Sequence, residues 1–188
     1  MIARDSSRRH EFSSPLFPLD QFYESAGLAL PRFKQLDGRE MLEPYRGLLV
    51  HNGDMTPALE NHYRKTIHIH LLQARRKKTE YSREVVLLLN GDNRPVEFGA
   101  IRINLELFNK KAREEIVEAH IPLGTILREY NIVHTSSPRA YLQVKSDGVI
   151  NNALELPRAT ALFGRRNTLS TPAGEPLAEI VEILAPAL

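Results

Sequence analysis

The strongest constraint in this sequence is a change of hydrophobic period near residue 66. Apolar residues and histidines alternate over residues 67–71, and a period of two is typical of a strand. Residues 83–89 are a second strand, apolar and partly β-branched after Arg83 and Glu84. Residues 90–93 (Asn-Gly-Asp-Asn) are typical of a tight turn, and a third strand returns over residues 96–105. We therefore predict three strands that form an antiparallel meander.

Helices are predicted on the N-terminal side of this meander. Residues 19–50 look helical, because apolar residues recur at helical spacing between Met41 and Leu49. Thr56 followed by Pro57 resembles an N-cap and the first position of a short second helix.

Strands return in the last third of the chain. Residues 105–116 have the apolar stripe and charged face of an amphipathic helix. Residues 141–144, 162–169 and 177–184 are then candidate strands. Strands, a helix and further strands predict an α+β fold, with helices packed on a mostly antiparallel sheet.

Length and composition favour a single domain that does not span a membrane. The chain has 188 residues, enough for one substantial core. Residues 1–15 are polar, basic and serine-rich, which predicts a disordered tail before a single domain over 16–188. The N-terminus lacks the apolar stretch of a secretory signal, and no apolar run approaches the ~20 residues of a membrane span. We expect a cytoplasmic protein without membrane contact.

Several classes of function are disfavoured. The chain contains no cysteine, which excludes disulfides, thiolate catalysis and cysteine zinc sites. The net charge is only +2, and the basic residues 75–78 fall where a hairpin should turn. No nucleic-acid partner is therefore expected.

Candidate charged residues lie in otherwise apolar strands. Arg83 opens one strand, where it either anchors a carboxylate or reaches solvent. Glu179 and Glu182 lie three apart in the last strand and so face opposite sides. One of them is either buried, and then protonated or paired, or exposed on an edge strand.

Two histidines have the spacing of a metal half-site. His68 and His70 share one strand face, and His62, Glu84 or Glu97 could supply a third ligand. A half-buried strand produces the same alternation, so no metal is predicted.

Six short motifs follow one another along the chain. They are Asp54-Met55-Thr56, Ser82-Arg83-Glu84-Val85-Val86-Leu87, Pro122-Leu123-Gly124, Phe163-Gly164-Arg165-Arg166-Asn167-Thr168-Leu169, Gly174-Glu175-Pro176-Leu177 and Glu182-Ile183-Leu184-Ala185-Pro186. Together, from about residue 50 to the end, they resemble the chorismate lyase family.

The resemblance implies a lyase that converts chorismate to 4-hydroxybenzoate and pyruvate in an enclosed pocket. It implies that Arg83 and Glu182 are catalytic. Glu179 is the alternative carboxylate, because the spacing between the Gly174–Leu177 motif and Glu182 is one residue longer than in the family. The implied substrate-binding residues are Arg83, Leu123 through its backbone, Met55, Thr56, Arg165 and Arg166.

The reaction suits these residue types. Loss of the C4 hydrogen and the enolpyruvyl ether makes the ring aromatic, so the enzyme mainly fixes geometry and neutralises charge. In this hypothesis Arg83 holds a substrate carboxylate and a protonated Glu182 donates to the oxygen where charge develops. No metal, nucleotide or other cofactor is required.

A second interpretation shares the fold but not the catalysis. Effector-sensing domains of bacterial transcription regulators use this fold to bind a small aromatic or carboxylic acid, and fold alone does not decide function. A third is a lyase relative that acts on another enolpyruvyl or aromatic acid.

Overall fold

The computed structural model describes residues 14–187 as one antiparallel sheet with helices on both faces. The predicted tail, apart from Ser14 and Pro15, lies outside the described residues. The strand order is β1-β5-β6-β7-β4-β3-β2. The strands are β1 (Phe33–Leu36), β2 (Ile67–Lys77), β3 (Glu80–Leu89), β4 (Pro95–Asn104), β5 (Thr135–Lys145), β6 (Ala161–Ser170) and β7 (Pro176–Leu184). The helices are α1 (Leu19–Ser25), α2 (Tyr45–Leu49), α3 (Met55–Tyr63), α4 (Lys110–Glu118), α5 (Leu123–Glu129) and α6 (Gly148–Ala153), with short 3-10 turns η1 (Gly38–Glu40) and η2 (Leu105–Leu107).

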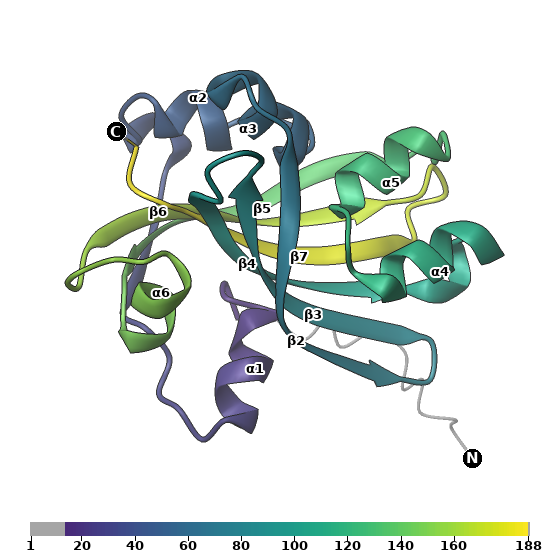
Figure 1. The fold of residues 1–188 in the computed structure, drawn as a ribbon, viewed down its shortest axis with the longest axis horizontal. Coiled ribbons are helices and arrows are strands. Elements are labelled where there is room, and N and C mark those ends of the chain that lie inside the picture. Colours follow the sequence, from purple (N-terminus) through teal and green to yellow (C-terminus); the bar gives the residue numbers. More distant parts are fainter. Residues whose placement is uncertain (1–13, 188) are drawn as a thin grey trace, which may run out of the picture.

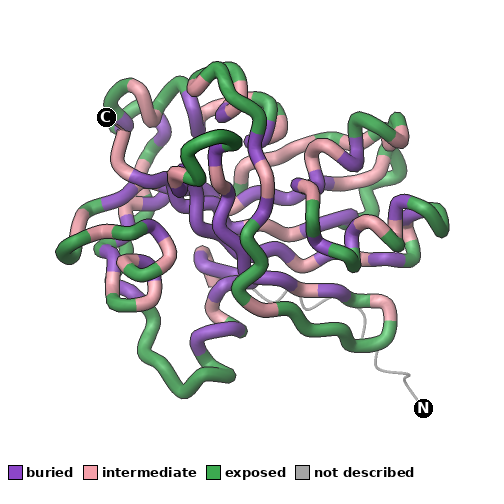
Figure 2. Tube along the Cα trace, viewed as in Figure 1, coloured by how far each residue is buried: buried purple, intermediate pink, exposed green. Residues whose placement is uncertain are grey.

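The central strands β3, β4, β6 and β7 are largely buried on both faces of the sheet, whereas the edge strands β1 and β2 are mostly exposed. Helices α1 and α6 pack on one face, over residues such as Val86, Phe98 and Val181. On the other face there are two separate apolar clusters, one under α4 and α5 and one under α2 and α3. Figure 1 shows α2 and α3 at one end of the sheet and α4 and α5 at the other, and Figure 2 shows the buried strands between them.

The α+β fold and the predicted meander are confirmed. β2 pairs with β3 and β3 pairs with β4, all antiparallel, and the turn between β3 and β4 contains Gly91 at φ 102°. Strands β5, β6 and β7 form a second meander, which joins the first through β4 and β7. The three candidate strands near the C-terminus lie within β5, β6 and β7.

The prediction of a helical stretch over residues 19–50 is wrong in part. Only α1 and α2 are α-helical there, while β1 pairs with β5 between them. Pro31 and Pro44 explain the interruption, because the residue before a proline disfavours helical geometry. Met41 precedes the helix but still packs in one cluster with Leu48 and Leu49.

The start of α3 also differs from the prediction. Asp54, and not Thr56, occupies the N-cap position, with φ −75° and ψ 146°. Its carboxylate makes no capping hydrogen bond, which leaves it available for a contact elsewhere.

Two further boundaries differ from those predicted. The amphipathic helix begins at Lys110 after an Asn109 cap, and residues 105–107 form a 3-10 turn instead. The basic residues 75–77 belong to β2, so the hairpin turns just after them. Among residues 14–187, no helix is long and apolar enough to cross a membrane.

Candidate functional site

A cavity lies between the sheet and the starts of helices α3 and α5. It measures ≈ 70 Å³, room for a few water molecules at ~10–15 Å³ each. It therefore suits a small ligand. Its lining residues are Asp54, Met55, Thr56, Ile69, Arg83, Val85, Leu87, Glu97, Gly99, Ala100, Ile101, Pro122, Leu123, Gly124, Asn167, Leu169, Ile180, Val181 and Glu182.

The strand register explains why charged residues meet there. Gly99 on β4 pairs with Val85 on β3 and with Glu182 on β7. Two residues along the strands, Arg83 pairs with Ile101. Two residues in the other direction, Glu97 pairs with Leu87. Because alternate residues share a face, the side chains on this face of β3, β4 and β7 form one wall of the cavity.

Gly99 forms a flat part of this wall for a steric reason. A Cβ atom at this position would lie 2.5 Å from the carbonyl oxygen of Val181 and 3.4 Å from Oε1 of Glu97. The position therefore requires glycine, and the absence of a side chain leaves space between Arg83 and Glu97.

Arg83 is a buried cation without an acidic partner among the described residues. Only 2% of the residue is exposed. Nη1 donates to the carbonyl of Ile116 at 3.1 Å and Nη2 donates to that of Ile121 at 3.5 Å, while Nε has no partner within residues 14–187. Burial lowers the pKa of Arg83 to about 10, with Tyr81 opposing the shift, so the guanidinium is still charged at neutral pH.

Glu182, in contrast, is paired. Its Oε2 accepts a hydrogen bond from Nε of Arg165 at 2.5 Å, and both side chains are buried. Arg165 also donates to the carbonyls of Leu49, His51 and Gly53. The pair therefore fixes the chain segment that leads into α3.

Arg166 and Glu179 form a second ion pair on the opposite face of the sheet. Nη2 of Arg166 lies 3.2 Å from Oε2 of Glu179, and Nη1 donates to the carbonyl of Ser14 at 3.4 Å. Thr168 donates to the same Glu179 oxygen at 3.0 Å. Because neighbouring residues of a strand face opposite sides, one pair points towards the cavity side and the other towards α1.

Glu97 is a buried carboxyl group at the cavity wall. Only 5% of the residue is exposed, and Oε2 has no hydrogen-bond partner among the described residues. Burial raises the pKa of Glu97 well above its ordinary value of 4.5, the charge of Glu182 raises it further, and Arg165 offsets part of the shift. These effects favour the neutral acid.

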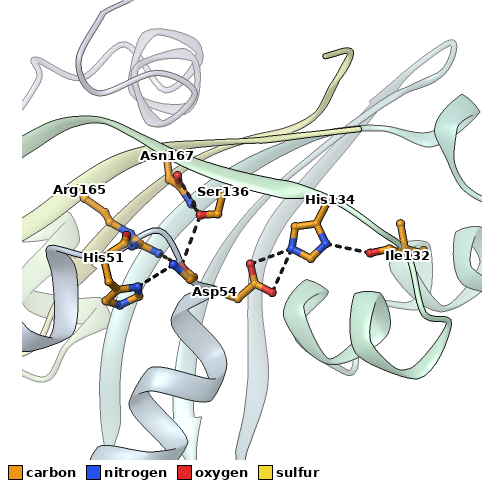
Figure 3. Close-up of polar contacts among 8 residues, drawn as sticks. His51, Asp54, Ile132, His134, Ser136, Arg165 and Asn167 are labelled. Atoms are coloured by element: carbon orange, nitrogen blue, oxygen red, sulfur yellow. Dashed lines mark hydrogen bonds and ion pairs between the residues drawn. The ribbon is translucent and has the colours of Figure 1, made fainter. Parts of the chain in front are cut away.

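Asp54, the N-cap residue of α3, contacts His134, the residue just before β5 (Figure 3). Nε2 of His134 lies 3.0 Å from Oδ1 of Asp54, and Nδ1 lies 2.9 Å from the carbonyl of Ile132. Both ring nitrogens thus face acceptors, which suits the doubly protonated ring. Burial lowers the pKa of His134, but these hydrogen bonds and the charge of Asp54 outweigh it and raise the pKa above 6.5.

Neighbouring polar groups complete the network in Figure 3. Nδ1 of His51 accepts from the Gly53 amide at 3.0 Å, so Nε2 carries the proton and donates to the carbonyl of Leu48 at 2.8 Å. Burial, with the charge of Arg165, lowers the pKa of His51 and keeps it neutral. Asn167, which lines the cavity, donates to Oγ of Ser136 at 2.9 Å.

The structure brings most of the predicted site residues together. Arg83, Leu123, Met55, Thr56 and Glu182 all line the cavity. Arg165 lies directly behind Glu182, whereas Arg166 lies on the other face.

Sequence reasoning missed the cavity roles of three polar residues. Asp54 entered only as part of a motif, Asn167 likewise, and Glu97 was considered only as a metal ligand. The register of β4 against β3 and β7 sets Glu97 on the same face of the sheet as Arg83 and Glu182, and the sequence alone does not give that register.

The residues of the possible metal site are dispersed. Nδ1 of His68 lies 2.6 Å from Oδ1 of Asn90, while Glu97 faces the cavity. Within residues 14–187, no three His, Cys, Asp or Glu side chains are grouped to hold a metal ion.

The sequence matches no known family model and no curated protein. Solved structures match its fold. The structure of PhnF from Mycobacterium smegmatis has a TM-score of 0.53 at 12% identity, covering 88% of this chain and 92% of that one. The effector domain of the same PhnF has a TM-score of 0.52 at 11% identity, covering 70% and 88%.

A third structure extends this likeness. The possible transcriptional regulator YydK from Bacillus subtilis has a TM-score of 0.50 at 10% identity, covering 63% of this chain and 58% of that one. Identities this low establish a shared fold, and one fold hosts different functions. This α+β fold is therefore one that proteins described as a regulator and as an effector domain also adopt.

Proposed function

We propose that this protein is a small-molecule binding domain whose cavity takes a carboxylic acid, with the carboxylate held by Arg83. The observation that carries the proposal is the burial of Arg83 with no acidic partner among residues 14–187. A buried charge that lacks a counter-ion costs several kcal/mol. A ligand carboxylate would offset this cost, and the planar guanidinium can bind it with two parallel hydrogen bonds.

The remaining walls suit the apolar body of such a ligand. Val85, Ile101 and Leu169 are buried, and Gly99 offers a flat surface between them. An apolar cavity with a few fixed polar groups is typical of a small-ligand site. The likeness to the effector domain of PhnF supports binding as the function.

Calorimetry with 4-hydroxybenzoate and its neutral amide tests this proposal. The acid should bind more tightly than the amide, and Arg83→Met should cost about 2–5 kcal/mol of binding free energy, at least about thirtyfold in Kd. Arg102→Gln is the matched control, because Arg102 lies on β4, outside the cavity lining, and pairs with Glu80. Equal affinity for acid and amide would refute the role of Arg83.

A second candidate function is the conversion of chorismate to 4-hydroxybenzoate and pyruvate. It is favoured by the order of the six sequence motifs and by the carboxylate of Glu182, which shares the cavity with Arg83. Glu182 would then act as the acid-base or hydrogen-bonding carboxylate, held in place by its contact with Arg165.

Product analysis separates the two candidates. After incubation with chorismate, chromatography should show 4-hydroxybenzoate and pyruvate in equal amounts if the protein is a lyase, and neither if it only binds. Glu179→Gln should leave turnover unchanged in the first case, because Glu179 faces away from the cavity. Tight binding of 4-hydroxybenzoate without turnover would exclude the lyase function and support the binding function.

A further inference from the structure

We infer that the carboxyl group of Glu97 hydrogen-bonds a polar oxygen at the end of the ligand remote from Arg83, and so selects ligands that carry one. This inference rests on the proposed function, since it takes the carboxylate on Arg83 as the other fixed end. The ligand class that follows is a small carboxylic acid with a hydroxyl, ether or carbonyl oxygen at its far end.

The first step is the unsatisfied oxygen of Glu97. Oε2 is buried and has no partner among the described residues. A buried polar atom left without a hydrogen bond costs roughly 1–3 kcal/mol, and native structures rarely retain one without a reason. At the wall of a ligand cavity, the simplest reason is that the ligand supplies the missing partner.

The second step is the placement of Glu97 relative to Arg83. Arg83 on β3 pairs with Ile101 on β4, and Glu97 lies four residues before Ile101 on that strand. Four residues of a strand span about 13 Å. The two groups therefore mark opposite ends of the cavity wall, and Gly99 lies halfway between them without a side chain.

The third step is the contrast with Glu182, the other carboxyl group of the cavity. Glu182 is paired with Arg165 at 2.5 Å, whereas Glu97 makes no ion pair among the described residues and has Leu87 and Leu184 as its register neighbours. As a neutral acid, Glu97 can both donate and accept a hydrogen bond. It therefore recognises an uncharged oxygen, while a second carboxylate at this end would face two acidic groups.

Two ligands of nearly equal shape test the inference without any variant. 4-Hydroxybenzoate and 4-methylbenzoate share the carboxylate and differ only in the group that would reach Glu97. We expect the wild-type protein to bind the hydroxyl compound about tenfold more tightly. Equal affinity, or a preference for the methyl compound, would overturn the inference even though the proposed function still holds.

Variants then assign the preference to Glu97. Glu97→Leu should reverse it, because a methyl group packs on leucine and a hydroxyl group loses its partner, and Glu97→Gln should largely keep it. Glu84→Gln is the matched control, since Glu84 is a buried strand glutamate that accepts a hydrogen bond from Gln73 at 2.7 Å and lies outside the cavity lining. A preference that survives Glu97→Leu would overturn the assignment.

The outcomes separate the two proposals. If neither acid binds, or if 4-hydroxybenzamide binds as tightly as the acid, the proposed function fails and this inference fails with it. If both acids bind through Arg83 with the same affinity, only the inference on Glu97 fails.

Discussion

Arg165 and Glu182 face each other on the neighbouring strands β6 and β7, with Nε and Oε2 only 2.5 Å apart. The side chain of Arg165 is 0% exposed and that of Glu182 is 6% exposed. Three backbone carbonyls accept hydrogen bonds from Nη1 and Nη2 of Arg165. This arginine therefore joins the final strand to the segment before α3, and its replacement should destabilise the fold.

Arg165→Met should lower the free energy of unfolding by about 3–5 kcal/mol, because it leaves the carboxylate of Glu182 buried without its partner. Urea denaturation measures the effect. Arg128→Met is the control: its ion pair with Glu60 spans 4.0 Å and its side chain is 58% exposed, so the cost should be at most about 1 kcal/mol. Similar losses in both variants would contradict the prediction.

Arg83→Met should have the opposite effect in the absence of ligand. Arg83 is buried like Arg165 but has no carboxylate partner in the part of the chain that the structure describes, so replacing it removes an uncompensated charge. We expect the free energy of unfolding of Arg83→Met, measured in urea, to equal that of the wild type or to exceed it by about 1–4 kcal/mol. A loss as large as that of Arg165→Met would mean that the two carbonyl contacts of Arg83 stabilise the fold by themselves.

The contact between Asp54 and His134 should make stability depend on pH. The pKa of His134 is raised above 6.5 in the folded protein, so its contribution is fully present below the unfolded value and is lost as pH rises through the folded pKa. The difference in unfolding free energy between wild type and His134→Gln should therefore be largest at acidic pH and should shrink as pH rises above 6.5 through the raised folded pKa.

Asp54→Asn provides the control for this pH effect. With the carboxylate gone, the shrinking difference should largely disappear, and a double-mutant cycle with His134→Gln should give a coupling of ~0.5–3 kcal/mol at acidic pH. A difference that grows with rising pH would show that His134 is neutral in the folded protein.

Gly99→Ala should destabilise the protein by about 1–3 kcal/mol, because its Cβ would lie 2.5 Å from the Val181 carbonyl, a backbone atom. Gly148→Ala is the matched control. Gly148 lies at the start of α6, where a Cβ would meet no described atom within 4 Å, and the change should be neutral or stabilising by about 0.4–1 kcal/mol. Thermal melting of both variants tests the contrast.

The central sheet could be predicted from the sequence, because β3 and β4 carry a clear apolar signal and a turn between them. The segment 26–44 could not, because β1 is only four residues long with a mostly exposed burial pattern and forms through pairing with β5, more than a hundred residues away. The helical spacing of apolar residues between Met41 and Leu49 arises because both pack in one cluster. This packing does not require a continuous helix.

The candidate site shows the same division. The motifs around Arg83, Leu123 and Glu182 identified residues that line one cavity. Glu97 could not be assigned in this way, because both faces of β4 are buried and alternation then gives no inward direction. The contact between Asp54 and His134 joins positions 80 apart in sequence, so no local pattern indicates it.

The two apolar clusters under α2 with α3 and under α4 with α5 meet at the cavity. A ligand bound there would contact Met55 from the first cluster and Leu123 from the second, and so would act as a cross-link between two halves of the core. By mass action, a hundredfold excess of ligand over its Kd adds about 2.7 kcal/mol to stability. Slower backbone hydrogen exchange in α3 and α5 together, with little change in α1 and α6, would be the signature of such a cross-link.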